Sequence, residues 1–134
     1  MNDKIVKTEL LHGIEYTLDG KLHREDGPAI EYAGGSKEWY LHGVRHREDG
    51  PAREYSNGDK CWYLNDKLHR EDGPAIEYAN GAKWWYLNGI LHRLDGPAIE
   101  RADGRNQYWV NGNCLGFITS DQMLAYYLKY EFLK

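Results

Sequence analysis

Short aromatic and apolar segments alternate with pairs of turn-forming residues along most of the chain. The segment from Gly73 to Leu91 reads GPAIEYANGAKWWYLNGIL and contains Asn-Gly at residues 80–81 and again at 88–89. Asn-Gly favours the two-residue turn of a β-hairpin, because both turn residues must accept a positive φ. The runs between the dipeptides are rich in Tyr, Trp, Ile and Leu, which suit pleated strands. The pattern therefore predicts antiparallel β-hairpins joined by tight turns.

This segment recurs with a fixed period. HREDGPA begins at residues 23, 46 and 69 and HRLDGPA begins at residue 92, which gives a spacing of 23 residues. Four units fill residues 23–114, between an N-terminal segment (1–22) that holds a partial unit and a C-terminal segment (115–134). The prolines of the chain occupy one column of the repeat: Pro28, Pro51, Pro74 and Pro97. Such a period indicates a repeat architecture in which neighbouring units stack.

The turn dipeptides also predict which residues lie opposite one another. A two-residue turn at 80–81 sets Ile76 opposite Trp85, and the turn at 88–89 sets Trp85 opposite His92. One face of the sheet would carry Ile76, Tyr78, Trp85, Leu87 and His92, and the other Glu77, Trp84, Tyr86 and Arg93. Stacking would align two aromatic ladders: Trp39, Trp62, Trp85 and Tyr108 in one, and Tyr40, Tyr63, Tyr86 and Trp109 in the other.

Composition agrees with a thin sheet. The chain has 11 Tyr and 5 Trp but only 2 Phe, and its mean hydropathy is −0.80. Two partly wet faces favour aromatic side chains that also carry a polar atom. The architecture therefore accounts for the aromatic bias, which does not by itself indicate a function.

The unit, G-P-x-x-x-Y-x-N-G followed by W/Y-Y-L-N-G, resembles the MORN-type repeat. It is most similar to the variant in small bacterial and phage proteins, some of which are grouped with the antitoxins of toxin–antitoxin systems. The resemblance covers residues 13–114 and rests on the glycine and aromatic columns. It implies an all-β fold, an elongated and twisted antiparallel sheet of successive hairpins, that serves as a scaffold for binding.

The C-terminal segment has a different pattern. Thr119-Ser120-Asp121-Gln122 matches the T-x-x-Q capping box, which predicts a helix from there to about Leu133. The apolar residues at helical spacing are Met123, Leu124, Tyr127 and Leu128. We expect these residues to lie against the sheet, so that the helix closes the open end of the array.

Charge and cysteine content narrow the partners and the compartment. A net charge of −4 argues against binding to duplex nucleic acid or to an anionic membrane surface. No apolar run is long enough to cross a bilayer, and the N-terminus does not resemble a secretory signal. Cys61 and Cys114 suit free thiols in a reducing environment. We therefore expect a cytoplasmic protein, of a bacterium or of an infected host cell.

The repeated word His-Arg-x-Asp is not expected to form a metal or catalytic site. Successive histidines, from His23 to His92, would lie about 10 Å apart, too far to share one zinc ion. No nucleophile motif or phosphate-binding loop accompanies the word, so we expect no enzyme activity, metal or cofactor. Its expected role is structural, with Asp capping the turn and each Arg pairing across strands with a Glu. The expected pairs are Arg24–Glu31, Arg47–Glu54, Arg70–Glu77 and Arg93–Glu100.

Function is expected where the units differ. Trp84 stands where other units have Glu38, Cys61 and Gln107. Trp beside Arg is typical of interface hot spots, and the same pair can stack on a nucleobase. Contact with the C-terminal helix is the structural alternative for Trp84. The candidate binding residues are Trp84, Trp85, Tyr86, Arg53, Arg93, Arg101, Trp62 and Trp39.

The leading interpretation is a non-enzymatic protein that inhibits or sequesters a partner protein, as an antitoxin, immunity or phage anti-defence factor does. Two alternatives stay open: a sponge for a nucleotide-like signal held between aromatic and Arg rows, and a structural or assembly scaffold. An exposed terminal strand at residues 13–22 could also pair with a second copy and form a homodimer.

Overall fold

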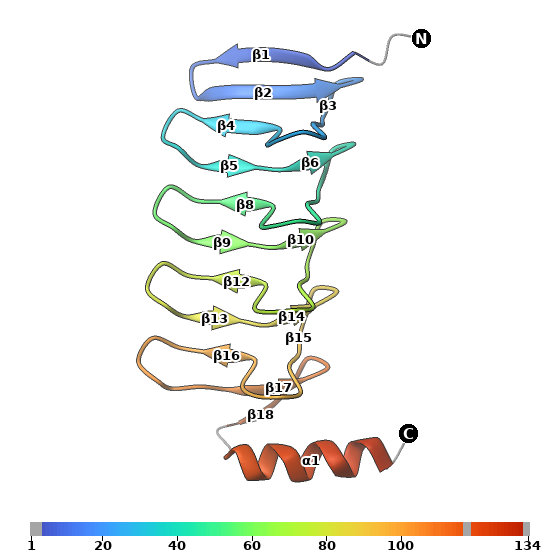
Figure 1. Cartoon of the computed structure of the whole chain (residues 1–134), viewed down its shortest axis with the longest axis vertical. Coiled ribbons are helices and arrows are strands. Elements are labelled where there is room, and N and C mark those ends of the chain that lie inside the picture. Colours follow the sequence, from blue (N-terminus) through green and yellow to red (C-terminus); the bar gives the residue numbers. More distant parts are fainter. Residues whose placement is uncertain (1–3, 117–118, 133–134) are drawn as a thin grey trace.

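The computed structural model describes residues 4–116 and 119–132, and it confirms an all-β hairpin array with a C-terminal helix (Figure 1). A ten-stranded antiparallel sheet runs along the molecule in the order β1-β2-β4-β5-β8-β9-β12-β13-β16, with β3 beside β2. Its strands are β1 (Val6–Leu10), β2 (Gly13–Leu18), β3 (Lys21–Leu22), β4 (Ile30–Tyr32), β5 (Lys37–Glu38), β8 (Arg53–Glu54), β9 (Lys60–Cys61), β12 (Ile76–Glu77), β13 (Lys83–Trp84) and β16 (Ile99–Glu100).

Along one side of this sheet, each full repeat adds a second, tighter hairpin (Figure 1). These hairpins are β6 (Tyr40–Leu41) with β7 (Val44–Arg45), β10 (Tyr63–Leu64) with β11 (Lys67–Leu68), β14 (Tyr86–Leu87) with β15 (Ile90–Leu91), and β17 (Tyr108–Val110) with β18 (Asn113–Gly116). Their turns have the predicted two-residue form, since Asn88 and Gly89 have φ of 51° and 79°. Trp85 and His92 lie opposite each other as expected, with the His92 amide donating to the Trp85 carbonyl.

The other turn in each unit is longer than predicted. Gly81 alone has a positive φ there, 94°, and its amide donates to the carbonyl of Tyr78. The Tyr78 amide in turn donates to Ala82, so the loop holds three residues: a type I turn followed by a glycine in the left-handed region. Asn80 accepts a hydrogen bond from the Ala82 amide through its side chain, which stabilises this turn.

The longer loop shifts the pairing by one residue, so the predicted register at 80–81 is wrong. Ile76 lies opposite Trp84, not Trp85, and Glu77 lies opposite Lys83. Because side chains alternate between faces, a one-residue shift moves every side chain of that strand to the other face. Trp84 therefore shares a face with Ile76, and Trp85 points to the opposite face.

The core is thin and built from small side chains. The alanine after each proline is fully buried, and the isoleucines that follow Ala29, Ala75 and Ala98 are nearly so. These alanines also connect neighbouring strands, as where the Trp85 amide donates to the Ala98 carbonyl at 2.7 Å. A small side chain at this position lets the neighbouring strands pack closely beside the proline. The larger aromatic side chains lie on the two faces of the sheet instead.

The helix α1 (Ser120–Phe132) starts at the predicted capping box. The Thr119 amide donates to the Gln122 side chain, and the Gln122 amide donates to the Thr119 hydroxyl. The predicted contact face is wrong in part, since Leu124 and Leu128 are 57% and 48% exposed. Tyr126 packs instead against Tyr108 and Val110 of the last hairpin. The predicted end at Leu133 and the side chains of Met123 and Tyr127 lie outside the described residues.

The N-terminal edge also differs from the prediction. The strand over residues 13–22 is not terminal, because β1 pairs with β2 from Val6↔Thr17 to Leu10↔Gly13. The open edge of the sheet is therefore β1. Among the described residues, no helix has the length and apolar character needed to cross a bilayer.

Candidate functional site

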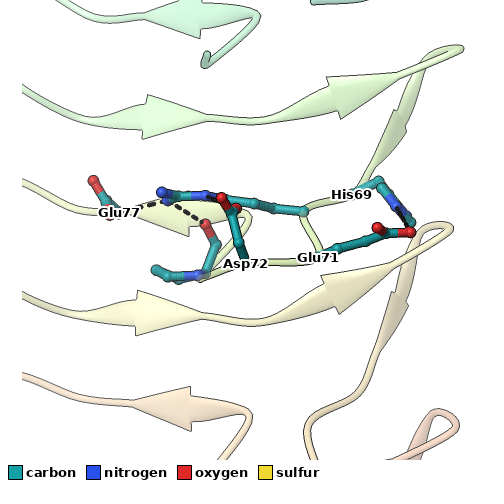
Figure 2. A network of polar contacts seen from close by, with 6 residues as sticks. His69, Glu71, Asp72 and Glu77 are labelled. Carbon is teal, nitrogen blue, oxygen red and sulfur yellow. Dashed lines mark hydrogen bonds and ion pairs between the residues drawn. The ribbon is translucent and has the colours of Figure 1, made fainter. Parts of the chain in front are cut away.

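The repeated Arg is held by four partners on one face of the sheet, and Figure 2 shows its polar contacts in the third unit. In the third unit, the Arg70 Nε donates to Asp72 at 3.1 Å, and one terminal nitrogen donates to the Pro74 carbonyl at 3.1 Å and to Glu77 at 3.2 Å. The guanidinium lies 4.0 Å from the centre of the Trp62 ring. One side chain thus connects the proline step, the following strand and the aromatic ladder.

We call this arrangement the arginine clamp, and it recurs in every unit. The Arg–ring pairs are Arg24–Tyr16, Arg47–Trp39, Arg70–Trp62 and Arg93–Trp85, at 3.9, 3.9, 4.0 and 3.8 Å. The predicted Arg–Glu pairs are confirmed, at 3.5, 3.5, 3.2 and 3.0 Å in unit order. The Asp of each word, expected to cap the turn, is held by the Arg Nε. Gly73 leaves room for the guanidinium, since a Cβ there would lie 3.0 Å from the Arg70 Cζ.

The repeated His ties each unit to the next. Its Nδ1 accepts a hydrogen bond from a backbone amide 19 residues later, in the tight turn of the following hairpin. The donors to His23, His46, His69 and His92 are the amides of His42, Asn65, Asn88 and Asn111, at 2.9, 3.0, 2.9 and 2.9 Å. Accepting this bond requires an unprotonated Nδ1. The His column is therefore part of the stacking geometry.

We predict that acidification weakens the last of these links. Burial lowers the pKa of His92 below its usual 6.5, so the unfolded chain takes up the proton first as the pH falls. The contribution of His92 to stability is thus complete above about pH 7 and is lost as the pH drops through 6.5 toward the folded pKa. In urea unfolding at pH 7.5 and 5.5, His92→Gln should lose less stability between the two pH values than the wild type. An NMR titration that places the His92 pKa at or above 6.5 would contradict this prediction.

Several predicted binding residues belong to the arginine clamps. Trp39, Trp62 and Trp85 each lie under a guanidinium, and Arg93 holds Trp85, Asp95 and Glu100. At 3.8–4.0 Å from the ring centre, the guanidinium leaves no room for a base between ring and cation. These constant columns are therefore already engaged within the array.

The opposite face of the sheet carries two columns of tyrosines and the positions that vary between units. We call it the tyrosine face and define it by Tyr32, Tyr40, Tyr55, Tyr63, Tyr78 and Tyr86, with Glu38, Arg53, Cys61 and Trp84 between them. Strand pairing places the intervening residues on this side, through Ile30↔Glu38↔Arg53↔Cys61↔Ile76↔Trp84. Partial burial raises the pKa of Tyr78 and Tyr86, so these rings remain neutral and present both hydroxyl and apolar surface.

Trp84 lies on β13, toward the C-terminal end of this face. Its cross-strand neighbours are Ile76 and Ile99, and its ring meets Tyr78 edge-on with 5.8 Å between centroids. The helix packs its Tyr126 on the last hairpin, against Tyr108 and Val110. Trp84 and Tyr86 therefore lie on the tyrosine face, while Trp85 lies on the clamp face.

Two departures from the repeat pattern compensate each other on the tyrosine face. Arg53 stands where other units have Ile, and its Nε lies 2.6 Å from the carboxylate of Glu38, which is 6% exposed. The hydroxyl of Tyr32 donates to the same carboxylate at 2.9 Å. Burial, reinforced by this hydrogen bond and by the negative charge of Glu38, raises the pKa of Tyr32 to about 12. Arg53 is thus engaged by a buried partner.

A second compensating pair lies beside the first. Asp66 occupies the glycine position of its tight turn with φ of 67°, and its carboxylate accepts from the Arg45 Nε at 2.7 Å. Arg45 stands where other units have leucine, and its guanidinium lies 4.4 Å from the centre of the Tyr63 ring. Sequence reasoning missed Arg45, Asp66 and the Glu38–Arg53 pair. Comparing the residues that depart from the repeat in neighbouring units would have revealed both pairs. In each pair, an Arg that replaces the usual residue of its column lies one unit from an Asp or Glu that the other units lack in its column.

The remaining departures have no such compensating partner among the contacts described above. Arg101 is exposed and takes the place of Tyr78 in the last unit, directly after β16, which lies four strands from β8 and its Arg53 in the sheet order. Cys61 is half-buried, and burial raises the pKa of its thiol. A hollow of about 190 Å³ on this face is lined by Tyr32, Ser36, Lys37, Glu38, Arg53, Glu54 and Tyr55.

Among the described residues, no three His, Cys, Asp or Glu side chains are grouped so that they could hold a metal ion. No protein-family model matches the chain, and no curated protein matches it significantly. The surface chemistry of the two faces is therefore the basis for assigning a function.

Proposed function

We propose that this chain is a non-catalytic binding protein that engages a partner protein through the tyrosine face and thereby inhibits or sequesters it. The observation that carries the proposal is a division between faces. The invariant word of each unit is engaged in arginine clamps and His links, whereas Trp84, Glu38, Arg53 and Cys61 share the opposite face.

The composition of the tyrosine face suits protein recognition. Tyr and Trp present large and rigid contact area with a polar atom, and they are enriched at interface hot spots. Trp84 and Tyr78 form an aromatic cluster, and the partly exposed Arg53 and the Arg45–Asp66 pair supply charge of both signs farther along the same face. Such a surface fits a partner that offers an apolar patch with polar groups beside it.

The alternatives are weaker on the same observations. A nucleotide held between the Arg and Trp rows would have to displace a guanidinium that already has four partners. An assembly scaffold would also need a binding face, and it differs from an inhibitor in forming a larger particle. The resemblance to MORN-type repeats, some of them in antitoxin-like proteins, motivates the antitoxin, immunity or anti-defence interpretation of the proposed partner.

We predict that Trp84→Gln abolishes capture of the partner. Gln is the residue at the equivalent position of the last unit, Gln107, so the column tolerates it. Loss of a hot-spot Trp is expected to weaken binding by about 2 kcal/mol or more, roughly 30-fold. The measurement is affinity capture from bacterial lysate by wild type and variant, followed by titration of the recovered protein by calorimetry.

The matched control is Leu94→Glu, which restores the residue of the other units in a connecting loop outside the tyrosine face. It should capture the partner as the wild type does. The proposal fails if the wild type retains no stoichiometric protein, or if Leu94→Glu and Trp84→Gln lose the partner equally. Calorimetry with cyclic and linear nucleotides tests the sponge alternative on the same preparation.

A further inference from the structure

The N-terminal end of the long sheet is an open edge strand. β1 pairs with β2, and within residues 4–116 and 119–132 it pairs with no other strand. Its five residues are exposed, as are Ile5 and Leu11 beside it. Figure 1 shows β1 at one end of the array and α1 at the opposite end. β1 contains no proline and pairs in regular register, so nothing in the strand itself prevents a further strand from pairing with it.

The backbone groups available at this edge belong to Lys7 and Glu9. The Tyr16 amide donates to Ala29 and its carbonyl accepts from His23, so both point away from β1. Tyr16 lies opposite Lys7, which makes this a non-hydrogen-bonded pair in which the amide and carbonyl of Lys7 point outward. The pattern alternates along the strand, and the backbone of Glu9 points outward in the same way.

We propose that β1 pairs with β1 of a second copy of this chain, antiparallel and centred on Thr8. The sequence IVKTELL over residues 5–11 is then self-complementary. Lys7 lies opposite Glu9 of the second copy, Val6 opposite Leu10, and Ile5 opposite Leu11. Thr8 faces its own counterpart at the twofold axis. Every apolar residue of this segment meets an apolar residue, and every charge meets an opposite charge, which gives two Lys7–Glu9 pairs per dimer.

Other registers are disfavoured by the same residues. Backbone groups that point outward from one β1 must meet those that point outward from the other. Because these groups alternate along the strand, the register can shift only in steps of two residues. One step in either direction sets Lys7 opposite Lys7, or Glu9 opposite Glu9, of the second copy. Like charges directly opposite each other are destabilising in a β-sheet. The charges therefore select the register centred on Thr8.

This pairing would join two arrays into one sheet about twice as long. Directly opposed residues share a face, so the twofold axis is normal to the sheet and both tyrosine faces lie on the same side. The two helices would lie at the far ends, where α1 packs on the last hairpin. The inference rests on β1 alone and does not depend on the proposed function.

The test is the native mass of the full chain, measured by light scattering or sedimentation. The wild type should have twice the monomer mass of 15.6 kDa. Lys7→Glu and Glu9→Lys each create two like-charge pairs per dimer, and each should raise the dimer dissociation constant at least about tenfold. Mixing the two variants should restore the dimer, because each acidic edge then meets a basic one. The double variant K7E/E9K should dimerise as the wild type does.

Lys129→Glu, an exposed charge reversal in α1, is the matched control and should leave the mass unchanged. Circular dichroism of each variant verifies that the fold is retained. A wild type that stays monomeric at about 100 µM overturns the proposal, because a dimer with a micromolar dissociation constant would be largely assembled at that concentration. A dimer that persists in both single variants, or a mixture of them that stays monomeric, overturns it as well.

Discussion

Arg53→Ile is expected to lower the free energy of unfolding by about 3 kcal/mol, although Ile is the residue of the other three units at this position. The substitution removes the cation 2.6 Å from Glu38 and leaves a carboxylate that is 6% exposed and still accepts a hydrogen bond from the Tyr32 hydroxyl. Breaking a buried ion pair from one side costs more than the pair contributes, because the remaining charge stays desolvated. Urea unfolding at pH 7 measures the loss.

The rescue variant makes this prediction specific. Replacing Glu38 with Gln, as in Gln107 of the same column, should recover most of the stability lost in Arg53→Ile. The prediction is wrong if Arg53→Ile is as stable as the wild type at pH 7, or if Glu38→Gln does not rescue it. In either case the buried Glu38–Arg53 pair does not contribute to the stability of the fold in the expected way.

Arg70→Ala is expected to lower the free energy of unfolding by about 2 kcal/mol. After allowing for partial exposure, the charged hydrogen bonds together contribute about 1 kcal/mol and the ring contact contributes about 1 kcal/mol. The variant loses its bonds to Asp72, Pro74 and Glu77 and uncovers Trp62. Arg70→Lys should lower the free energy of unfolding nearly as much, because a lysine ammonium lacks the planar guanidinium that contacts all of these partners at once. The measurement is urea unfolding followed by Trp fluorescence.

The control is Arg105→Ala, which removes an exposed Arg–Asp pair outside the clamps. It should change the free energy of unfolding by less than about 0.5 kcal/mol. Equal effects of Arg70→Ala and Arg105→Ala would mean that the clamp contributes no more than an ordinary surface ion pair.

The repeat and the tight hairpins were predictable from the sequence, but the face of Trp84 was not. The period, the proline column and the Arg–Glu pairs follow directly from residue spacing, and the structure confirms those pairs. Asn-Gly, however, occurs both in a two-residue turn and in a three-residue loop with glycine in the left-handed region. The structure has the first form at Asn88 and the second at Asn80. Because a one-residue shift exchanges the faces, that ambiguity was enough to misplace Trp84.

The candidate site was predictable in part for a related reason. Departures from a repeat mark positions where the units differ, and Trp84 and Arg53 were found in this way. Whether a departure is free to bind or is compensated in the next unit depends on cross-strand pairing, which places Arg53 on Glu38 and Arg45 on Asp66. The residues of the clamps were assigned to binding because Trp beside Arg looks the same in a hot spot and in a clamp.

The most direct test of the account is a side-chain footprint of the chain bound to its captured partner. Hydroxyl-radical oxidation of the free and bound protein, read by mass spectrometry, reports which aromatic side chains the partner covers. We expect protection of Tyr55, Tyr78 and Trp84, and unchanged oxidation of Trp39 and Trp62 under their guanidinium groups. Protection of the clamp-face tryptophans, with Trp84 left as reactive as in the free protein, would contradict the assignment of binding to the tyrosine face.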